Sequence, residues 1–192
     1  MVKYTELCEE IESMIGDLKR VIIAIDGMCA AGKTTLANKL KESFSGACIV
    51  SMDDFYLPFS QRSEAVMAEP GGHMDYERFT EEVALPLWKA HPVSYGVFDC
   101  HSQSIVRTVE IPSDASLIIV EGTYATHPSI PDIYDYRLFV KTDSKTQKAR
   151  VTLREGEGAA AYFEKWIPRE AVYFSAYMTE ELADAVYISE NE

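Results

Sequence analysis

Short apolar runs alternate with amphipathic stretches along this chain. The runs are rich in Val and Ile, which is typical of strands buried on both faces, and they lie at residues 21–25, 47–52, 117–120, 136–141 and 185–188. In residues 5–18 apolar residues recur three and four positions apart, which predicts a helix there. Helices are also expected over residues 34–44, 144–154 and 169–182. Buried strands that alternate with helices form parallel sheets covered on both faces. The pattern therefore predicts a three-layer α/β sandwich around a parallel, five-stranded sheet.

The middle of the chain departs from this alternation. Prolines and glycines interrupt residues 57–75, which predicts an irregular segment. A helix over residues 76–89, broken or kinked near Pro86, and a short edge strand over residues 95–98 are expected to follow. The chain contains no internal repeat, low-complexity tract or linker, so we expect residues 1–192 to form a single domain.

Charge narrows the choice of partners. The 192 residues include 31 acidic side chains and 18 lysines and arginines, which gives a formal net charge of −13. Such an excess of acid argues against a nucleic-acid backbone or an anionic membrane surface as partner, because both require a basic footprint. Net positive charge is confined to residues 21–45 and 141–154. A single phosphorylated ligand remains compatible with this distribution.

The sequence also predicts where in the cell the protein is located. No apolar run approaches the roughly 18–20 residues that a membrane-spanning helix needs, and three glutamates among the first ten residues do not suit a secretory signal. The four cysteines form no CxxC pair or zinc-like spacing; they are Cys8, Cys29, Cys48 and Cys100. We therefore expect reduced thiols and a cytoplasmic protein. The oligomeric state stays open, a homo-oligomer included.

Residues 27–34 carry the strongest motif. Their sequence, GMCAAGKT, is the GxxxxGKT pattern of a phosphate-binding P-loop, and it lies between a predicted strand and a predicted helix. The loop amides can point at phosphates, Lys33 can reach the β- and γ-phosphates, and the Thr34 hydroxyl can ligate Mg²⁺. The motif predicts ATP and Mg²⁺ as ligands. The predicted ATP-binding residues are Gly27, Met28, Cys29, Ala30, Ala31, Gly32, Lys33, Thr34 and Thr35.

Other residues select among the classes of P-loop protein. A GTP-dependent switch needs an NKxD motif, whereas Asn38-Lys39 is followed by Leu40-Lys41. The chain is also short for a motor ATPase. A small-molecule kinase is the class that remains.

Residues 51–56, SMDDFY, resemble the DxFY signature of uridine kinases, which belong to the uridine kinase/phosphoribulokinase group. The resemblance continues at Asp75, at residues 98–102, at residues 120–122, and at Arg150 and Arg154, so that it spans about residues 20–190. It implies transfer of the γ-phosphoryl group of ATP to a hydroxyl of an uncharged acceptor, with the 5′-hydroxyl of uridine or cytidine favoured.

A kinase must accept a proton from the acceptor hydroxyl, and two neighbouring carboxylates could do so. Asp53 matches the base position of the family, and neighbours on an extended segment point in opposite directions. Asp53 is therefore favoured over Asp54, which stays open as the alternative. Glu121 follows a buried strand where P-loop proteins carry a metal-binding acid, so the resemblance implies that Thr34, Glu121 and Asp53 hold Mg²⁺.

The same resemblance implies three acceptor contacts. Tyr56 would pack against the nucleobase, Asp75 would bind the ribose hydroxyls and His101 would contact the base. The alternatives are a core tyrosine, a helix N-cap and a surface histidine. Where the family has an arginine two residues after the histidine, this chain has Gln103, so the acceptor itself stays open.

A short lid is expected over about residues 150–168, and an acceptor-binding insert over about residues 54–110. Arg150 and Arg154 share one helical face and suit the charge that develops during transfer. The family's basic run after the second arginine is missing here. Trp166 and Arg169 are interpreted as packing and surface ion-pairing residues.

Two other functions remain open. One is the same chemistry on a non-nucleoside acceptor such as a vitamin precursor or a sugar. The other is a regulatory protein that binds a nucleotide without an acceptor. The paired aspartates and the lid arginines favour an enzyme, because a protein that only binds ATP has no need of a base.

Overall fold

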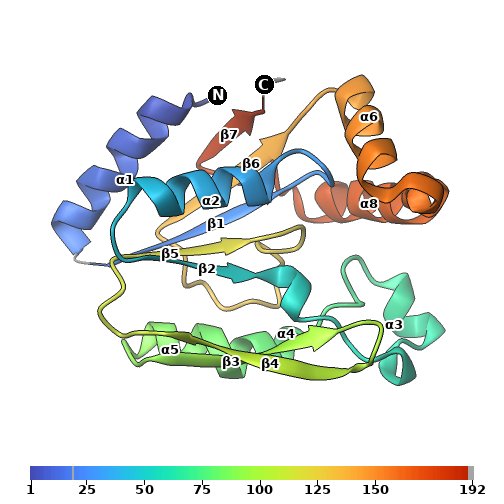
Figure 1. The fold of residues 1–192 in the computed structure, drawn as a ribbon, viewed down its shortest axis with the longest axis horizontal. Helices are drawn as coiled ribbons and strands as arrows, with labels where there is room; N and C mark the ends of the chain where they lie inside the picture. The colour runs from blue at the N-terminus through green and yellow to red at the C-terminus, as the bar shows by residue number, and fades with distance from the viewer. Residues whose placement is uncertain (19, 190–192) are drawn as a thin grey trace.

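The computed structural model describes residues 1–18 and 20–189 (Figure 1). The strands are β1 (Val21–Gly27), β2 (Ala47–Ser51), β3 (Val93–Asp99), β4 (Ser104–Ile111), β5 (Leu117–Glu121), β6 (Tyr136–Lys141) and β7 (Ala185–Ile188). The helices are α1 (Tyr4–Leu18), α2 (Lys33–Ser43), α3 (Glu64–Ala68), α4 (Tyr76–Phe79), α5 (Leu85–Trp88), α6 (Ser144–Glu155), α7 (Ala159–Ala161) and α8 (Ile167–Tyr177). Short 3₁₀ or π turns occupy Met52–Asp54, Phe59–Gln61, Thr80–Ala84, Gly156–Gly158 and Tyr162–Trp166.

The main sheet confirms the predicted core. It has five strands in the order β2-β5-β1-β6-β7, and every neighbouring pair is parallel. The β6–β7 pair, at one edge, runs in register from Leu138 opposite Ala185 to Lys141 opposite Ile188. β1 and β5 are buried along their whole length, as their unbroken apolar sequences predict. The fold class inferred from the hydrophobic pattern is therefore correct.

Both faces of this sheet are covered. Alternate residues of each strand point to opposite faces, so each face packs its own set of side chains against the covering elements. Ile23 and Ile25 of β1 pack in one core cluster with residues of α1 and α2. Ile22 and Ala24 pack in the other cluster, which includes side chains of α4, α5, α8 and β3. The arrangement gives the three predicted layers.

The region beyond β2 differs from the prediction in two ways. Residues 95–98 do not form an edge strand of the main sheet: they belong to β3, which pairs antiparallel with β4 in a separate two-stranded sheet. β4 itself was not predicted, because seven of its eight residues are wholly or partly exposed and lack the apolar run of a buried strand. In Figure 1 this hairpin lies with α4 and α5 along the β2 side of the molecule.

The helical predictions need three corrections. Residues 76–89 form a helical stretch that continues through Pro86, because a π turn at Thr80–Ala84 precedes the proline and α5 begins beside it. The helix expected over 169–182 is α8, which ends at Tyr177 because Met178 takes a left-handed conformation with φ 49°. Residues 57–75 are not wholly irregular, since they include α3.

The carboxyl ends of the central strands bring the sequence motifs together. Glu121 at the end of β5 lies in register with Ile25 of β1 on one side and Ser51 of β2 on the other. The P-loop, Glu121 and the turn Met52–Asp54 therefore meet at one edge of the sheet, where ligands of parallel sheets bind. In the described part of the chain, no helix has the length and apolar character needed to span a membrane.

Candidate active site

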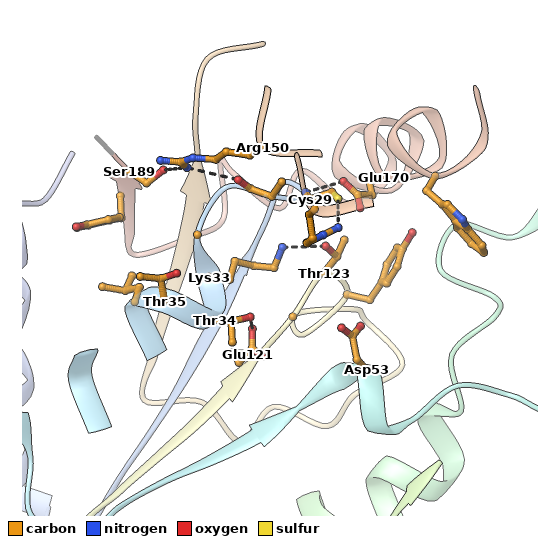
Figure 2. A pocket seen from close by; sticks show the side chains of 18 of the residues that line it. Cys29, Lys33, Thr34, Thr35, Asp53, Glu121, Thr123, Arg150, Glu170 and Ser189 are labelled. Atoms are coloured by element: carbon orange, nitrogen blue, oxygen red, sulfur yellow. Dashed lines mark hydrogen bonds between the residues drawn. The ribbon is translucent and has the colours of Figure 1, made fainter. Parts of the chain in front are cut away.

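A cleft of about 1630 Å³ opens at this edge. Its volume exceeds the roughly 300–1,000 Å³ of a pocket that holds one small ligand. Figure 2 shows Lys33 near the centre, with Arg150 and Ser189 on one side and Asp53 on the other. The cleft is large enough for two ligands side by side.

The P-loop holds its lysine inside the curl of the backbone. The Lys33 ammonium donates to the carbonyl oxygens of Gly27 at 2.8 Å and Met28 at 2.9 Å, and to the Thr123 hydroxyl at 3.1 Å. These three acceptors are uncharged, so they orient the ammonium without neutralising it. Gly32, at the start of α2, has φ 94°, a conformation that suits glycine. The loop therefore presents positive charge at the beginning of a helix, which favours an anion.

Three oxygen-bearing side chains meet below the loop. The hydroxyls of Thr34 and Ser51 donate to opposite oxygens of the Glu121 carboxylate, at 3.2 and 3.3 Å. Burial raises the pKa of Glu121, the charge of Asp53 acts in the same direction, and Lys33 opposes both. A buried carboxylate beside a hydroxyl is a suitable donor set for a hard cation such as Mg²⁺.

The protein supplies only part of a cation's coordination. Within the described residues, no group of three or more His, Cys, Asp or Glu side chains could hold a metal ion. Mg²⁺ is usually held by one or two carboxylates together with phosphate oxygens and water. The Thr34–Glu121 pair therefore fits an ion that binds together with a phosphorylated ligand.

The two neighbouring aspartates after β2 have different surroundings. Asp53 lines the cleft, and its Oδ1 accepts a 2.9 Å hydrogen bond from the Tyr56 hydroxyl. Asp54 does not line the cleft; its Oδ2 accepts a 3.2 Å hydrogen bond from Tyr95 of β3, and burial raises its pKa. Of the pair, Asp53 is the one that lines the same cleft as the P-loop.

Two arginines on α6 line the cleft from the lid side. Arg150 donates to the Ser189 hydroxyl at 2.8 Å and to the Ala30 carbonyl at 3.4 Å. Arg154 donates to the Cys29 sulfur at 3.3 Å, and its guanidinium lies 5.3 Å from the Tyr162 ring centre. Both arginines therefore contact the P-loop from one helix.

Known nucleoside kinases are similar to this chain in sequence. No family model matches the chain. A uridine kinase of Clostridium novyi (strain NT) is 26% identical over 146 residues, which cover 72% of this chain and 69% of that protein. Human nicotinamide riboside kinase 2 is 26% identical over 144 residues, covering 70% of this chain and 58% of that protein, so the match spans little more than half of it.

Two solved structures share the fold. A possible uridine kinase from Bacillus stearothermophilus has a TM-score of 0.67 at 20% identity, covering 95% of this chain and 99% of that one. A putative fructose transport system kinase from Silicibacter sp. TM1040 has a TM-score of 0.76 at 21% identity, covering 97% and 100%. The chain is similar in sequence to uridine kinases and nicotinamide riboside kinases, and it has the fold of uridine kinase-like P-loop kinases. Its reaction class is phosphoryl transfer to an alcohol acceptor.

Two residues that the sequence assigned to the acceptor do not line the cleft of this kinase. Asp75 caps α4, where its Oδ1 accepts a 3.0 Å hydrogen bond from the Arg78 backbone. His101 is exposed on the turn between β3 and β4. The third, Tyr56, does line the cleft. Gln103, on the same turn as His101, accepts a 2.7 Å hydrogen bond from the Phe59 backbone.

Sequence reasoning missed other residues of the cleft. Glu170 of α8 is buried, and its Oε2 accepts a 2.8 Å hydrogen bond from the Cys29 amide of the P-loop. Burial raises the pKa of this carboxyl to about 7. Thr123, Trp166 and His73 line the cleft as well. No local motif marks these positions. Glu170 does lie on the same face as the apolar Tyr173 of the helix predicted from Arg169, and that position could have indicated that it is buried.

Proposed function

We propose that this kinase transfers the γ-phosphoryl group of ATP to the 5′-hydroxyl of a pyrimidine nucleoside, uridine or cytidine. The observation that carries the proposal is the position of Asp53, whose carboxylate lines the same cleft as the P-loop lysine and the Thr34–Glu121 pair. Similarity to uridine kinases supports a nucleoside as acceptor. The volume of the cleft supports two ligands, a nucleotide and an acceptor.

The P-loop is the proposed ATP site. Its backbone amides and the Lys33 ammonium bind the phosphates, and the free end of the α2 dipole adds positive potential. Thr34 and Glu121, with Asp53 through water, would hold Mg²⁺. When bound, that ion would draw negative charge from the β- and γ-phosphate oxygens.

Asp53 is the proposed base. Its carboxylate accepts the proton of the acceptor hydroxyl as the oxygen attacks the γ-phosphorus, and the Tyr56 hydroxyl orients it through the 2.9 Å hydrogen bond. Arg150 and Arg154 of α6 stabilise the charge that develops on the transferring group. Asp54 is a poorer candidate, because its carboxylate is bonded to Tyr95 outside the cleft.

The remaining regional assignments are also proposals. Residues 54–110 form the acceptor-binding insert of one domain, and residues 150–168 form the lid. Residues 46–140 carry five basic and 14 acidic side chains, and this excess would repel an acceptor that is already phosphorylated. The four free thiols suit a cytoplasmic protein.

A second acceptor is suggested by the similarity to nicotinamide riboside kinase 2. Uridine and nicotinamide riboside share a ribose, so the same base and phosphate site would serve both. The two candidates differ in the ring, which is neutral in one and cationic in the other.

The test is ADP release from Mg²⁺–ATP in the presence of uridine, cytidine, nicotinamide riboside, pantothenate and simple sugars. We expect uridine or cytidine to stimulate release most strongly, with the 5′-monophosphate as product. Stimulation by pantothenate or a sugar alone would reject the nucleoside proposal and leave the kinase assignment intact.

A further inference from the structure

His73 is a buried histidine on the wall of the cleft. Its side chain is 2% exposed, and its Nδ1 atom has no hydrogen-bond partner among the described residues. Buried polar atoms in folded proteins are nearly always paired, because an unpaired one loses its hydration without compensation. A ligand in the cleft can supply the missing partner if one of the rings packed against the imidazole moves aside.

Two backbone features fix His73 at this place. Residues 55–57 pair with residues 73–75: the Leu57 amide donates to the His73 carbonyl at 2.9 Å, and the Asp75 amide donates to the Phe55 carbonyl at 2.7 Å. Before this pair, a Cβ at Gly72 would lie 2.0 Å from the Val66 carbonyl oxygen. The close approach requires glycine, and it sets the histidine beside Tyr56.

Aromatic rings from three parts of the chain surround the imidazole. The Tyr56 ring stacks at 5.8 Å between centroids, and the Tyr124 ring meets it edge-on at 4.9 Å. The Trp166 ring, from the proposed lid, lies at 5.3 Å and is tilted by 49°. Tyr56, His73, Tyr124 and Trp166 form what we call the ring slot, and all four line the cleft that contains Asp53.

We propose that His73 is a specificity-determining residue, which hydrogen-bonds the heterocyclic ring of the acceptor when that ring takes the place of the Trp166 ring, which lies in contact with the imidazole. This inference rests on the proposed nucleoside kinase function and names the part of the acceptor that is recognised. It assigns recognition of the ring to His73, whereas the sequence resemblance pointed to His101, which is exposed outside the cleft.

The charges around the slot favour an uncharged ring. Burial lowers the pKa of His73 to about 4, and the charges of Arg62, Arg169 and Lys165 act in the same direction, so the imidazole is neutral. It can therefore accept a hydrogen bond at one nitrogen and donate at the other.

The aromatic faces of the slot already have cations beside them. The Arg62 guanidinium lies 5.6 Å from the centre of the Tyr56 ring, and the Lys165 ammonium lies 4.6 Å from that of Trp166. These contacts use the negative faces of both rings. A cationic ring such as a pyridinium would meet like charges, whereas an uncharged pyrimidine would not.

The experiment uses tryptophan fluorescence and steady-state kinetics on the full chain. Replacing Trp88, which is 73% exposed, by Phe leaves Trp166 as the remaining tryptophan. In this background, uridine should change the Trp166 emission, and nicotinamide riboside should do so only at concentrations at least about 10-fold higher. His73→Phe keeps a planar ring and removes both nitrogens, and it should lower kcat/KM for uridine by about 10-fold or more with the KM for ATP unchanged.

Thermal stability distinguishes a role of His73 in recognising the ligand from a role in packing. Because His73→Phe removes an unpaired buried nitrogen, its Tm should equal or exceed that of the parent chain. His127→Phe is the matched control: this buried histidine has both nitrogens bonded, to Pro70 and Ser129, and does not line the cleft. It should lower Tm without changing the preference for uridine over nicotinamide riboside. If His73→Phe does not fold, His73→Leu, which also lacks a hydrogen-bonding group, provides the same comparison.

Two outcomes overturn the inference in different ways. If the parent kinase phosphorylates uridine and the His73 variants keep its kcat/KM, ring recognition by His73 is rejected and the proposed function stands. A preference for nicotinamide riboside over uridine would contradict the inference that the ring slot favours an uncharged ring. If only acceptors without a heterocycle are phosphorylated, the nucleoside function and this inference are both rejected.

Discussion

Glu170 accepts a 2.8 Å hydrogen bond from the backbone amide of Cys29, a residue 141 positions earlier in the chain. This contact joins α8 to the P-loop and sets a carboxylate at the edge of the proposed phosphate site. The Gln147 side chain donates to the Cys29 carbonyl at 3.0 Å from α6. The peptide groups on both sides of Cys29 are therefore held by the helices that flank the proposed lid.

Glu170 should make the stability of the protein depend on pH. Its pKa is raised from 4.5 to about 7 by burial, so the folded chain binds this proton more tightly than the unfolded chain does. The resulting stabilisation is complete below about pH 4.5 and is lost as pH rises through about 7. Glu170→Gln, which stays neutral, should therefore raise Tm relative to the parent at pH 8 and much less at pH 5.

Thermal unfolding at the two pH values checks this expectation. Glu157→Gln, at an exposed position of the proposed lid, is the control and should give the same difference from the parent at both. An equal effect of Glu170→Gln at pH 5 and pH 8 would show that its carboxyl does not titrate in this range.

The same variant should bind ATP more tightly at pH 8. Removing a negative charge from the edge of the P-loop reduces its repulsion of the phosphates, and a gain of several-fold in affinity corresponds to about 1 kcal/mol. Titration calorimetry with ATP measures it directly. Weaker binding by Glu170→Gln would instead mean that the charged carboxylate is needed to hold the Cys29 amide in place.

Asp53→Asn should lose at least about 100-fold in transfer rate with ATP affinity retained, which is the usual scale for loss of a general base. Asp54→Asn is the neighbouring control, and it should keep turnover within a few-fold because Asp54 bonds Tyr95 outside the cleft. Single-turnover transfer and ATP binding are measured for both variants. If Asp54→Asn caused the larger loss of transfer rate, Asp54 would be the base instead of Asp53.

Removal of Mg²⁺ by EDTA should abolish transfer, and Glu121→Gln should raise the Mg²⁺ concentration needed for half-maximal rate by about 10-fold or more. The amide keeps acceptors for the Thr34 or Ser51 hydroxyl but lacks the charge that attracts the ion. The rate is followed against Mg²⁺ at saturating ATP. An unchanged Mg²⁺ dependence would remove Glu121 from the proposed metal site.

Two glycines give a matched pair for stability. Gly72→Ala would place its Cβ 2.0 Å from the Val66 carbonyl oxygen, so the backbone must shift at a cost of about 2 kcal/mol or more. Gly16→Ala, inside α1 and with nothing within 4 Å of the new atom, should instead stabilise the chain by up to about 1 kcal/mol. Denaturant unfolding of both variants checks the signs. A neutral Gly72→Ala would show that the turn before His73 tolerates a side chain.

The main sheet could be predicted because each of its strands is a contiguous apolar run. β1 needs nothing beyond its β-branched sequence to be identified, and the P-loop follows it directly. β4 could not be predicted in the same way, because its exposed residues are held mainly by pairing with β3. A hairpin on the surface leaves a weaker hydrophobic pattern than a strand in the core.

The sequence by itself determined the order of buried strands and helices, the phosphate-binding loop and the class of chemistry, because these depend on residues close together in the chain. Tertiary structure decided which polar side chains share the cleft. The Asp54 carboxylate bonds Tyr95 while Asp53 lines the cleft, and packing of α8 places Glu170 against Cys29. The physical reason is that burial and hydrogen bonding depend on packing between distant segments, which a local pattern does not encode.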